Sequence, residues 1–287
     1  MAIPFTKMHG AGNDYIFIDC MSGETKIKNP AELARQMSPP HFGIGADGIV
    51  LILPSSEADA RMRMFNADGS EGKMCGNAIR CVGKYLYDRG LTDKTTLTIE
   101  TLSGIKTLSL LVENGKIKEV CVDMGQAVLT GPSIPVLLDK PQAIREPIRV
   151  LDRDYTFTAV SMGNPHAVLF LDAIDTLALE TIGPHFENHP LFPERVNTEF
   201  VRLLPDGTLS MRVWERGSGE TYACGTGACA AAVAAVVNGY CRPDTDITVH
   251  LIGGALKIRV GTDLSVQMTG PCTKVYEGEY DYEVQDQ

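Results

Sequence analysis

The chain has 287 residues, enough for two domains of ordinary size, and its hydrophobic content of 44% is that of a folded globular protein. A formal net charge of −10 argues against nucleic acid or an anionic membrane surface as a partner, although one pocket can still be locally positive. The N-terminal MAIPFTKMHG lacks the apolar core of a signal peptide and the longest apolar stretch is too short to span a bilayer, so a soluble cytoplasmic enzyme is expected.

The first half of the chain is predicted to be mostly strands, with two helices. Residues 1–19 predict a strand, a glycine turn and a second strand, and residues 30–37 predict a helix capped by Asn29. The loop GIGADG at 43–48 matches the GxGxxG pattern, but it leads into a strand rather than a helix and is not interpreted as a nucleotide site. Further strands are predicted at 49–53, 61–66, 95–101, 106–113 and 116–123, and a second helix runs from Asn77 to Gly90.

The second half begins with a proline-rich connection at 132–147, predicted to be loop, and the domain boundary is placed near Gly125. After Cys224 the segment GACAAAVAAVV is apolar on every side, which predicts a buried helix that ends at Gly239. Strands are predicted at 155–160, 167–171, 199–203, 209–215, 247–251, 255–260 and 264–268.

Neither a metal site nor a cofactor is expected. There is no CxxC pair among the eight cysteines, and the chain is too long to need a disulfide framework. His185 and His189 have the spacing of ligands on one helical face, but prolines bracket them and the zincin pattern is absent. Most of the cysteines are predicted to be small buried hydrophobic residues, namely Cys20, Cys81, Cys121, Cys229, Cys241 and Cys272.

The two remaining cysteines lie in matched stretches. Phe65–Cys81 reads FNADGSEGKMCGNAIRC and Trp214–Ala230 reads WERGSGETYACGTGACA, so that Cys75 and Cys224 each precede glycine at the start of a predicted helix. Three features recur in the same order: Gly12-Asn13 at Gly163-Asn164, Cys75-Gly76 at Cys224-Gly225, and Gly125 at Gly270, with offsets of 151, 149 and 145. The repeat predicts two similar domains, residues 1–125 with 271–287 and residues 126–270, that share a cleft. The alternative is a single mixed α/β domain with recurrent glycine turns.

A pair of thiols at helix N-termini suits one reaction. The unpaired N–H groups of a helix start can bind a carboxylate, and the positive end of the helix is expected to lower the pKa of a thiol there. If a substrate α-carbon lay between two such thiols, one could remove its proton as the thiolate and the other could return a proton to the opposite face. The predicted activity is therefore two-base racemisation or epimerisation.

The motifs resemble those of the diaminopimelate epimerase family over nearly the whole chain: MHGAGNDYIFID, GIGADG, FNADGSEGKMCGNAIRC, GNPH, ERVNTEFV and ERGSGETYACGTGACA, in the family's order. The resemblance implies a mixed α/β (α+β) fold of two pseudo-symmetric domains, each a mostly antiparallel sheet or barrel wrapped round a central helix, with the active site in the interdomain cleft. It implies interconversion of LL- and meso-2,6-diaminopimelate without pyridoxal phosphate, in lysine and peptidoglycan-precursor biosynthesis, by a homodimer.

The resemblance also implies roles for individual residues. Cys75 and Cys224 match the two acid/base residues, and His166 and Glu215 match residues that tune the thiols, with Glu215 also accepting from the substrate ammonium. The positions that match substrate-binding residues are Asn13, Asn66, Gly76, Asn77, Asn164, Asn197, Glu215, Arg216, Gly225 and Thr226. Some relatives carry Gln where this chain has Gly48, so no side-chain contact is assigned there.

Two competing functions remain open at this stage. A proline racemase-like enzyme would also use a cysteine pair, but it should lack the distal clamp of Arg216 and the asparagines, because its substrate is smaller. A related dehydratase subtype replaces one cysteine, whereas both are present here. A non-catalytic thiol or metal-binding protein is a different class, supported only by the histidine and cysteine content.

Overall fold

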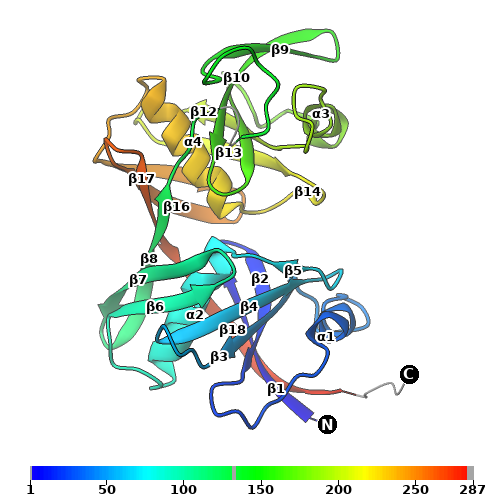
Figure 1. Ribbon diagram of the computed structural model, residues 1–287, viewed down its shortest axis with the longest axis vertical. Helices are drawn as coiled ribbons and strands as arrows, with labels where there is room; N and C mark the ends of the chain where they lie inside the picture. Colours follow the sequence, from blue (N-terminus) through cyan, green and yellow to red (C-terminus); the bar gives the residue numbers. More distant parts are fainter. Residues whose placement is uncertain (1, 131–133, 283–287) are drawn as a thin grey trace. The chain divides into compact units, whose positions relative to one another are not determined.

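The computed structural model describes residues 2–130 and 134–282, which form two compact units. Unit 1 comprises residues 1–122 and 270–287, and unit 2 comprises residues 123–269. The chain passes from one unit to the other within strands β8 (Lys116–Gln126) and β17 (Ser265–Pro271) (Figure 1). The C-terminal strand β18 (Thr273–Asp281) returns the chain to unit 1, where it pairs antiparallel with β1 (Ala2–Gly10).

Unit 1 contains one mixed sheet and two helices. Its hydrogen-bonded order is β18–β1–β2–β3–β4–β6–β7, and the pairs β2/β3 and β4/β6 are parallel while the others are antiparallel. β8 pairs antiparallel with β7 beyond it. The remaining elements are β2 (Asn13–Asp19), α1 (Pro30–Met37), β3 (Gly48–Leu53), β4 (Ala60–Asn66), β5 (Glu71–Gly72), α2 (Gly76–Asp88), β6 (Thr96–Thr101) and β7 (Gly104–Glu113).

Unit 2 repeats this topology. Its order is β9–β10–β11–β12–β13–β15–β16–β17, with parallel pairing at β11/β12 and β13/β15, the positions that correspond to the parallel pairs of unit 1. Its elements are β9 (Glu146–Val150), β10 (Arg153–Ser161), β11 (Pro165–Phe170), α3 (Leu179–Glu187), β12 (Asn197–Leu203), β13 (Leu209–Glu215), β14 (Gly219–Glu220), α4 (Gly225–Val237), β15 (Asp246–Leu251) and β16 (Gly254–Val260). The prediction of two pseudo-symmetric α/β domains is confirmed.

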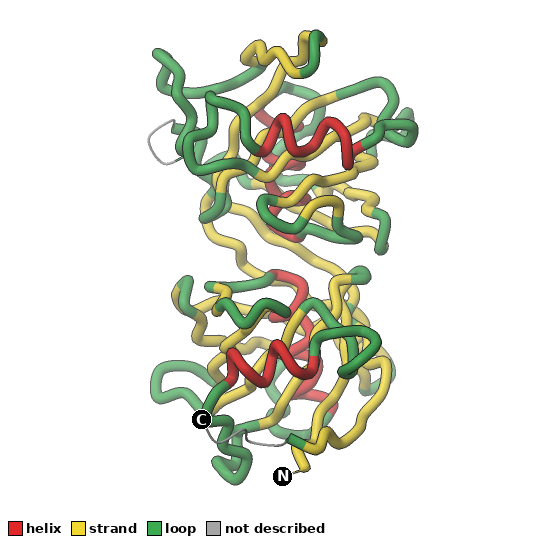
Figure 2. The backbone as a smooth tube through the Cα atoms, turned by 90° about the vertical axis from the view of Figure 1, so that its right-hand side faces the viewer, coloured by secondary structure: helices red, strands yellow, loops and turns green. Residues whose placement is uncertain are grey.

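Each unit is built round one central helix. In unit 2, α4 packs against β10, β11, β12, β13, β15 and β16, and in unit 1, α2 packs against β1, β2 and β7. Figures 1 and 2 show strands on several sides of both helices. The alanine-rich sequence of α4 explains its position, because small apolar side chains let strands approach from every direction, and residues 227–235 of the helix are all buried.

A matched ion pair precedes each central helix. Arg63 forks onto Glu71 with N–O distances of 2.7 and 3.0 Å, and Arg212 forks onto Glu220 at the same two distances. Each pair ties together a short hairpin, β4–β5 or β13–β14, directly before the cysteine. The two glutamates stand four residues before their cysteines, so this part of the sequence repeat corresponds to a repeated structure.

Five of the described elements were not predicted, namely helix α3 and the strands β5, β9, β14 and β18. The proline-rich segment 132–147 is not loop throughout, because strand β9 begins at Glu146; Pro132, at its start, lies outside the described residues. Helix α3 was not predicted, and Pro184, one of the two prolines that bracket His185 and His189, lies inside it. The helix tolerates the proline near its C-terminal end, where the Pro184 carbonyl accepts from the side chain and the backbone N–H of Asn188.

Candidate active site

Both predicted cysteines are N-cap residues of the central helices. Cys75 has extended backbone angles (φ −128°, ψ 120°) and its sulfur accepts from the Ala78 N–H at 3.5 Å. Cys224 has nearly the same angles (φ −109°, ψ 109°) and its sulfur accepts from the Gly227 N–H at 3.3 Å. A side-chain acceptor three residues before a free N–H is the ordinary N-cap arrangement, here made by a thiol.

In unit 1 a line of polar side chains runs past Cys75. Arg80, which is fully buried, donates to Asn77 Oδ1 at 2.9 Å, and Asn77 Nδ2 donates to Asn13 Oδ1 at 3.3 Å. Asn13 Nδ2 in turn donates to Asp47 Oδ2 at 2.6 Å. The Cys75 thiol donates to the same Asn13 oxygen at 3.2 Å. Three predicted residues, Asn13, Cys75 and Asn77, are thereby brought into direct contact.

Unit 2 has a corresponding line that reaches Cys224. Buried Glu199 contacts His166 Nδ1 through Oε1 at 2.7 Å, and His166 Nε2 contacts Asn164 Oδ1 at 3.1 Å. Asn164 Nδ2 donates to Thr226 Oγ1 at 3.3 Å, which lies 3.5 Å from Cys224 Sγ. The predicted residues His166, Asn164, Thr226 and Cys224 therefore form one hydrogen-bonded cluster.

Glu215 completes the surroundings of Cys224. Its carboxylate accepts from the Cys224 thiol and from the Thr221 hydroxyl. Burial raises the pKa of Glu215 above its ordinary value, and the two hydrogen bonds offset part of that effect. A carboxylate that contacts the thiol and favours its own protonated form is suited to exchange a proton with that thiol.

The expectation of a lowered thiol pKa is wrong for Cys224. Burial raises its pKa well above the ordinary value, and the negative charges of Glu215 and Glu199 raise it further. The hydrogen bonds from Thr226 and from the Gly227 N–H act in the opposite direction. The N-terminus of α4 does favour the thiolate, but desolvation and two nearby carboxylates outweigh it, so Cys224 rests as the thiol.

The other predicted residues lie outside these two hydrogen-bonded lines. Asn197 Oδ1 accepts from the backbone N–H of Arg216 at 3.0 Å, and the Arg216 guanidinium donates to the Glu194 carbonyl at 3.0 Å. Asn66 is the last residue of β4, and its side chain donates to Ser70 Oγ at 3.0 Å. Gly76 and Gly225 are the first residues of α2 and α4.

Gly48 has no room for a side chain in this backbone. A Cβ added to it would lie 2.0 Å from the carbonyl oxygen of Phe65 on the neighbouring strand. Because that atom belongs to the backbone, no rotamer relieves the clash, which agrees with the absence of a side-chain assignment at this position.

Three charged residues of these clusters were missed by the sequence analysis: Asp47, Arg80 and Glu199. Two of them, Arg80 and Glu199, are fully buried. The sequence carried a signal for Glu199, since it stands within the apolar strand run TEFV, where a carboxylate is unusual unless it has a partner. No local pattern marked Arg80, which lies on the helix face that packs inward.

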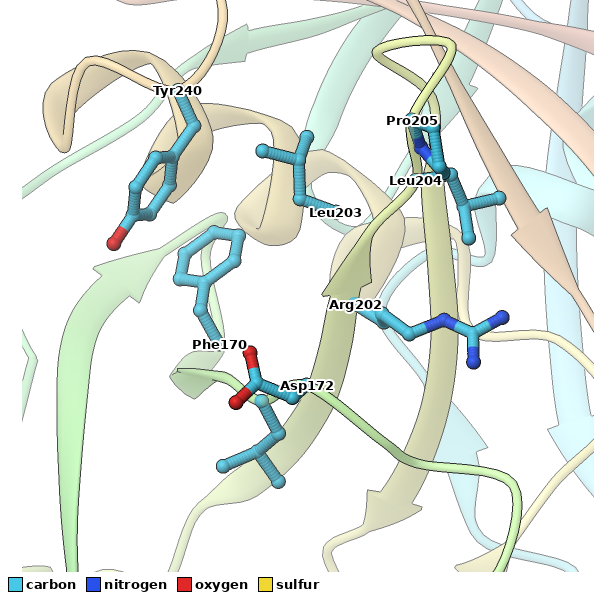
Figure 3. Close-up of a pocket in the computed structure, with 8 residues that line it drawn as sticks. Phe170, Asp172, Arg202, Leu203, Leu204, Pro205 and Tyr240 are labelled. Atoms are coloured by element: carbon cyan, nitrogen blue, oxygen red, sulfur yellow. The ribbon is translucent and has the colours of Figure 1, made fainter.

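A surface pocket of about 580 Å³ in unit 2 contains none of the predicted residues. It is lined by the rings of Phe170 and Tyr240, whose centroids are 4.7 Å apart, together with Asp172, Arg202 and residues 203–205 (Figure 3). The Arg202 guanidinium is held by Asp175 at 3.0 Å. This pocket is therefore separate from the cysteine cluster of unit 2.

Two features are not found among the described residues: a cluster of metal-binding side chains and a helix able to cross a bilayer. Across residues 2–130 and 134–282, no three His, Cys, Asp or Glu side chains cluster in a way that could hold a metal ion. Within the same ranges, no helix has both the length and the apolar character needed to cross a bilayer.

Comparison with known proteins decides the family. The sequence profile described as diaminopimelate epimerase matches residues 5–130 and 158–275. A diaminopimelate epimerase of Methanococcus maripaludis strain C6 is 56% identical over 278 residues, which cover 96% of this chain and 99% of the relative. The corresponding protein of Acetivibrio thermocellus is 55% identical over 278 residues, covering 96% and 98%. The chain belongs to the diaminopimelate epimerase family.

Membership of the diaminopimelate epimerase family confirms the resemblance found in the motifs and the prediction of an isomerase. Solved structures extend the likeness of fold further. A hydroxyproline epimerase from Agrobacterium vitis, with bound trans-4-hydroxy-L-proline, has a TM-score of 0.70 at 17% identity and covers 97% of this chain and 92% of its own. A PhzF-family protein of Bacillus anthracis has a TM-score of 0.70 at 16% identity, covering 98% and 100%. At such identities the likeness concerns the fold alone.

The buried thiols give this family member a testable alkaline sensitivity. Burial raises the pKa of Cys20 and of Cys272 from 9.0 to about 11. Between pH 9 and about 11 the unfolded chain loses these thiol protons while the folded chain keeps them, so the free energy of unfolding falls as pH rises. We expect a lower Tm at pH 10 than at pH 8, measured by circular dichroism, and a smaller decrease in the variant with Cys20→Ala and Cys272→Ala. An equal decrease in both proteins would contradict this origin.

Proposed function

We propose that the protein interconverts LL-2,6-diaminopimelate and meso-2,6-diaminopimelate by a two-base thiol mechanism that needs no pyridoxal phosphate. The observation that carries the proposal is the pair of N-cap cysteines, Cys75 and Cys224, on repeat-related central helices of a diaminopimelate epimerase family member. Inversion at an α-carbon requires proton removal from one face and delivery to the other, and one thiol is available for each step.

The helix starts are suited to bind the carboxylate next to the reacting carbon. The N–H groups of Gly76 and Asn77 in α2, and of Gly225 and Thr226 in α4, stand at the positive ends of the helix dipoles. Negative charge grows on this carboxylate as the α-proton leaves, so donors placed at these positions stabilise the carbanion more than the substrate.

At Cys224 the proton has an obvious route. The resting residue is a thiol hydrogen-bonded to Glu215, whose own raised pKa favours its protonated form. As acid, the Cys224 thiol donates to the carbanion. As base, it first transfers its proton to Glu215 and then accepts the α-proton as the thiolate, so that the two directions of the reaction use the same pair of groups.

The distal end of diaminopimelate needs a second clamp, because it is itself an amino acid. Arg216 is proposed to fork onto the distal carboxylate, and the amides of Asn13, Asn66, Asn164 and Asn197 provide further donors and acceptors. The bond from the Arg216 N–H to Asn197 Oδ1 supports this assignment, since it joins two of these residues directly.

Solvent deuterium exchange tests the function. The purified protein, with no added cofactor, is incubated in D₂O with LL-diaminopimelate, and deuterium at the α-carbon is measured by NMR. We expect incorporation together with formation of the meso isomer. L-Proline serves as the second substrate, because a proline racemase-like enzyme would label proline instead. Absence of label in both amino acids would refute an epimerase function.

The setting of the enzyme is proposed from the same family membership. We infer that the protein acts in the cytoplasm, in lysine biosynthesis and in the supply of meso-diaminopimelate for peptidoglycan, and that it is a homodimer. Light scattering coupled to gel filtration measures the mass directly: a particle of twice 31.1 kDa is expected, and a particle of 31.1 kDa would exclude the dimer.

A further inference from the structure

The side chains between Glu199 and Cys224 form an unbroken hydrogen-bonded line within unit 2. The four successive contacts join Glu199, His166, Asn164, Thr226 and Cys224 at 2.7, 3.1, 3.3 and 3.5 Å. Glu199 and His166 are both fully buried, and the second carboxylate oxygen of Glu199 has no hydrogen-bond partner in the described part of the chain. His166 is therefore the group that stabilises this buried carboxylate.

Each hydrogen bond from His166 to Thr226 can run in either direction. When His166 carries two ring protons, it donates from Nε2 to Asn164 Oδ1, and the amide NH₂ donates to Thr226 Oγ1. The hydroxyl proton of Thr226 is then available to the Cys224 sulfur, and either atom of that contact can be the donor. When His166 is neutral, with its one proton on Nδ1 toward Glu199, Nε2 accepts instead. The amide then turns over and Thr226 donates to the amide oxygen. Its hydroxyl proton is no longer available to the Cys224 sulfur, and the one thiol proton is donated to Glu215.

We propose that Glu199 and Thr226 are positioning residues of a reversible hydrogen-bond chain that couples the protonation of His166 to the ionisation of the Cys224 thiol. Protonated His166 turns the chain so that Thr226 donates to the sulfur, which stabilises the thiolate. Neutral His166 turns it so that Thr226 donates to Asn164 instead, which removes this stabilisation of the thiolate and leaves the thiol favoured. The catalytic consequence rests on the proposed function, but the coupling itself needs no substrate.

The equivalent line in unit 1 cannot reverse, which makes the property specific to one half of the repeat. It begins at Arg80, whose guanidinium can only donate, so Asn77 must present its oxygen to Arg80 and its NH₂ to Asn13. Asn13 in consequence presents its oxygen to Cys75 and its NH₂ to Asp47. Asn13 and Asn164 stand at matched repeat positions, but the amide of Asn13 is oriented by a line that begins at the donor-only Arg80, whereas Asn164 contacts His166, whose Nε2 can either donate or accept.

Other charged groups also lie near the Cys224 thiol. Their effects on its pKa must be distinguished from the effect of the hydrogen-bond chain. Glu215 contacts Cys224 from β13, Glu199 lies on β12, and the Gly227 N–H donates from α4. Both carboxylates raise the pKa of Cys224. Gly227 allows Glu199 to lie against the helix start, because a Cβ there would be 2.7 Å from Glu199 Oε1. Glu199 therefore affects the Cys224 pKa in two ways: directly through its negative charge, and indirectly through the hydrogen-bond chain.

A double-mutant cycle separates these two effects. The rate of Cys224 alkylation by iodoacetamide, resolved by peptide mass spectrometry, is measured against pH without substrate in the wild type, Thr226→Val, Glu199→Gln and the double variant. Thr226→Val removes the donor to the thiolate, and we expect it to raise the Cys224 pKa by about 0.5–1 unit, the equivalent of one hydrogen bond. Glu199→Gln removes a negative charge near Cys224, which lowers the Cys224 pKa. It also replaces the carboxylate that contacts His166 Nδ1 and so alters the hydrogen-bond chain, which acts on Cys224 through Thr226. In the Thr226→Val background only the effect of the lost charge remains.

If the hydrogen-bond chain operates, the effects of Glu199→Gln and Thr226→Val on the Cys224 pKa are not additive. The shift caused by Glu199→Gln should differ by about 0.5 unit or more between the wild-type background and the Thr226→Val background. Thr226→Ser, which keeps the hydroxyl, should restore the wild-type behaviour. Glu146→Gln removes another buried carboxylate of unit 2 and should be additive with Thr226→Val. If circular dichroism shows that Glu199→Gln is unfolded, Glu199→Asp replaces it, since the shorter side chain cannot reach Nδ1.

If Glu199→Gln shifted the Cys224 pKa equally in the wild type and in Thr226→Val, the coupling would be overturned. Glu199 would then affect Cys224 only through its negative charge. Because alkylation uses no amino-acid substrate, this outcome is independent of the deuterium-exchange result. A protein that failed the exchange assay with diaminopimelate could still show the coupling, and an active epimerase could still lack it.

Discussion

Replacing Cys224 by alanine is expected to lower the rate of diaminopimelate epimerisation by about 10²–10⁴-fold, the usual contribution of a positioned general acid or base. Replacing Cys75 by alanine should have an effect of the same size, because each thiol acts on one face of the α-carbon and neither can substitute for the other. The rate is measured as formation of the meso isomer from the LL isomer, and as wash-in of solvent deuterium.

The fold should survive both substitutions. Loss of one small sulfur from an N-cap removes a weak acceptor for the Ala78 or Gly227 N–H, which costs about 1 kcal/mol. Cys241→Ala is the matched control, since this half-buried thiol of unit 2 belongs to none of the proposed contacts, and it should leave turnover unchanged. Near-normal turnover in Cys75→Ala or Cys224→Ala would exclude the two-base scheme.

Replacing Arg80 by methionine is expected to destabilise unit 1 by about 3–5 kcal/mol, the range seen when one partner of a buried charged network is removed. The Arg80 guanidinium is fully buried and donates to the carbonyls of Gly76 and Pro271 and to Asn77 Oδ1. Methionine fills part of the volume but leaves these three oxygens without that donor. The bond to Pro271 also joins α2 to the segment that leads into β18.

The control for Arg80 lies on the same helix. Arg89 caps the C-terminal end of α2 and pairs with Glu277 at 2.7 Å, but its side chain is 45% exposed. Arg89→Met should therefore cost less than about 1 kcal/mol. Urea unfolding of both variants measures the difference, and amide hydrogen exchange should show faster opening of β18 in Arg80→Met alone. Equal stability of the two variants would mean that the buried guanidinium contributes no more than the surface pair.

Much of the fold could be predicted because the signals are local. Asn29 caps α1 and Pro30 begins it, as the sequence rule requires, and the Asn114-Gly115 turn has positive φ at both residues, the geometry of a two-residue hairpin turn. The repeat could be recognised in the sequence because the two central helices, α2 and α4, each begin with a cysteine N-cap followed by glycine. Helix α3 and strand β9 were missed because local signals misled: Pro184 normally argues against a helix, and the prolines near 141 and 147 normally argue for loop.

The candidate site could be predicted only in part. The sequence identified Cys75 and Cys224 as helix caps, since a cap depends on residues three positions apart, and the structure agrees. It did not indicate that Asp47 would contact Asn13, Arg80 would contact Asn77, or Glu199 would contact His166. Those contacts join residues that are distant in sequence or lie on a helix face whose partner is set by packing.

The sequence by itself determined the repeat, the family and the two thiols at helix starts, all of which follow from short-range patterns. Tertiary structure alone decided the ionisation of Cys224. The helix start predicted a lowered pKa, but burial and the charges of Glu215 and Glu199 raise it, and these depend on strands β12 and β13 folding against α4. Tertiary structure also decided that Asn13 and Asn164, alike in sequence, present opposite ends of their amides to the helix starts. The reason is physical: a helix cap is made within one turn of chain, whereas desolvation and hydrogen-bond polarity are set by whatever the rest of the fold places beside it.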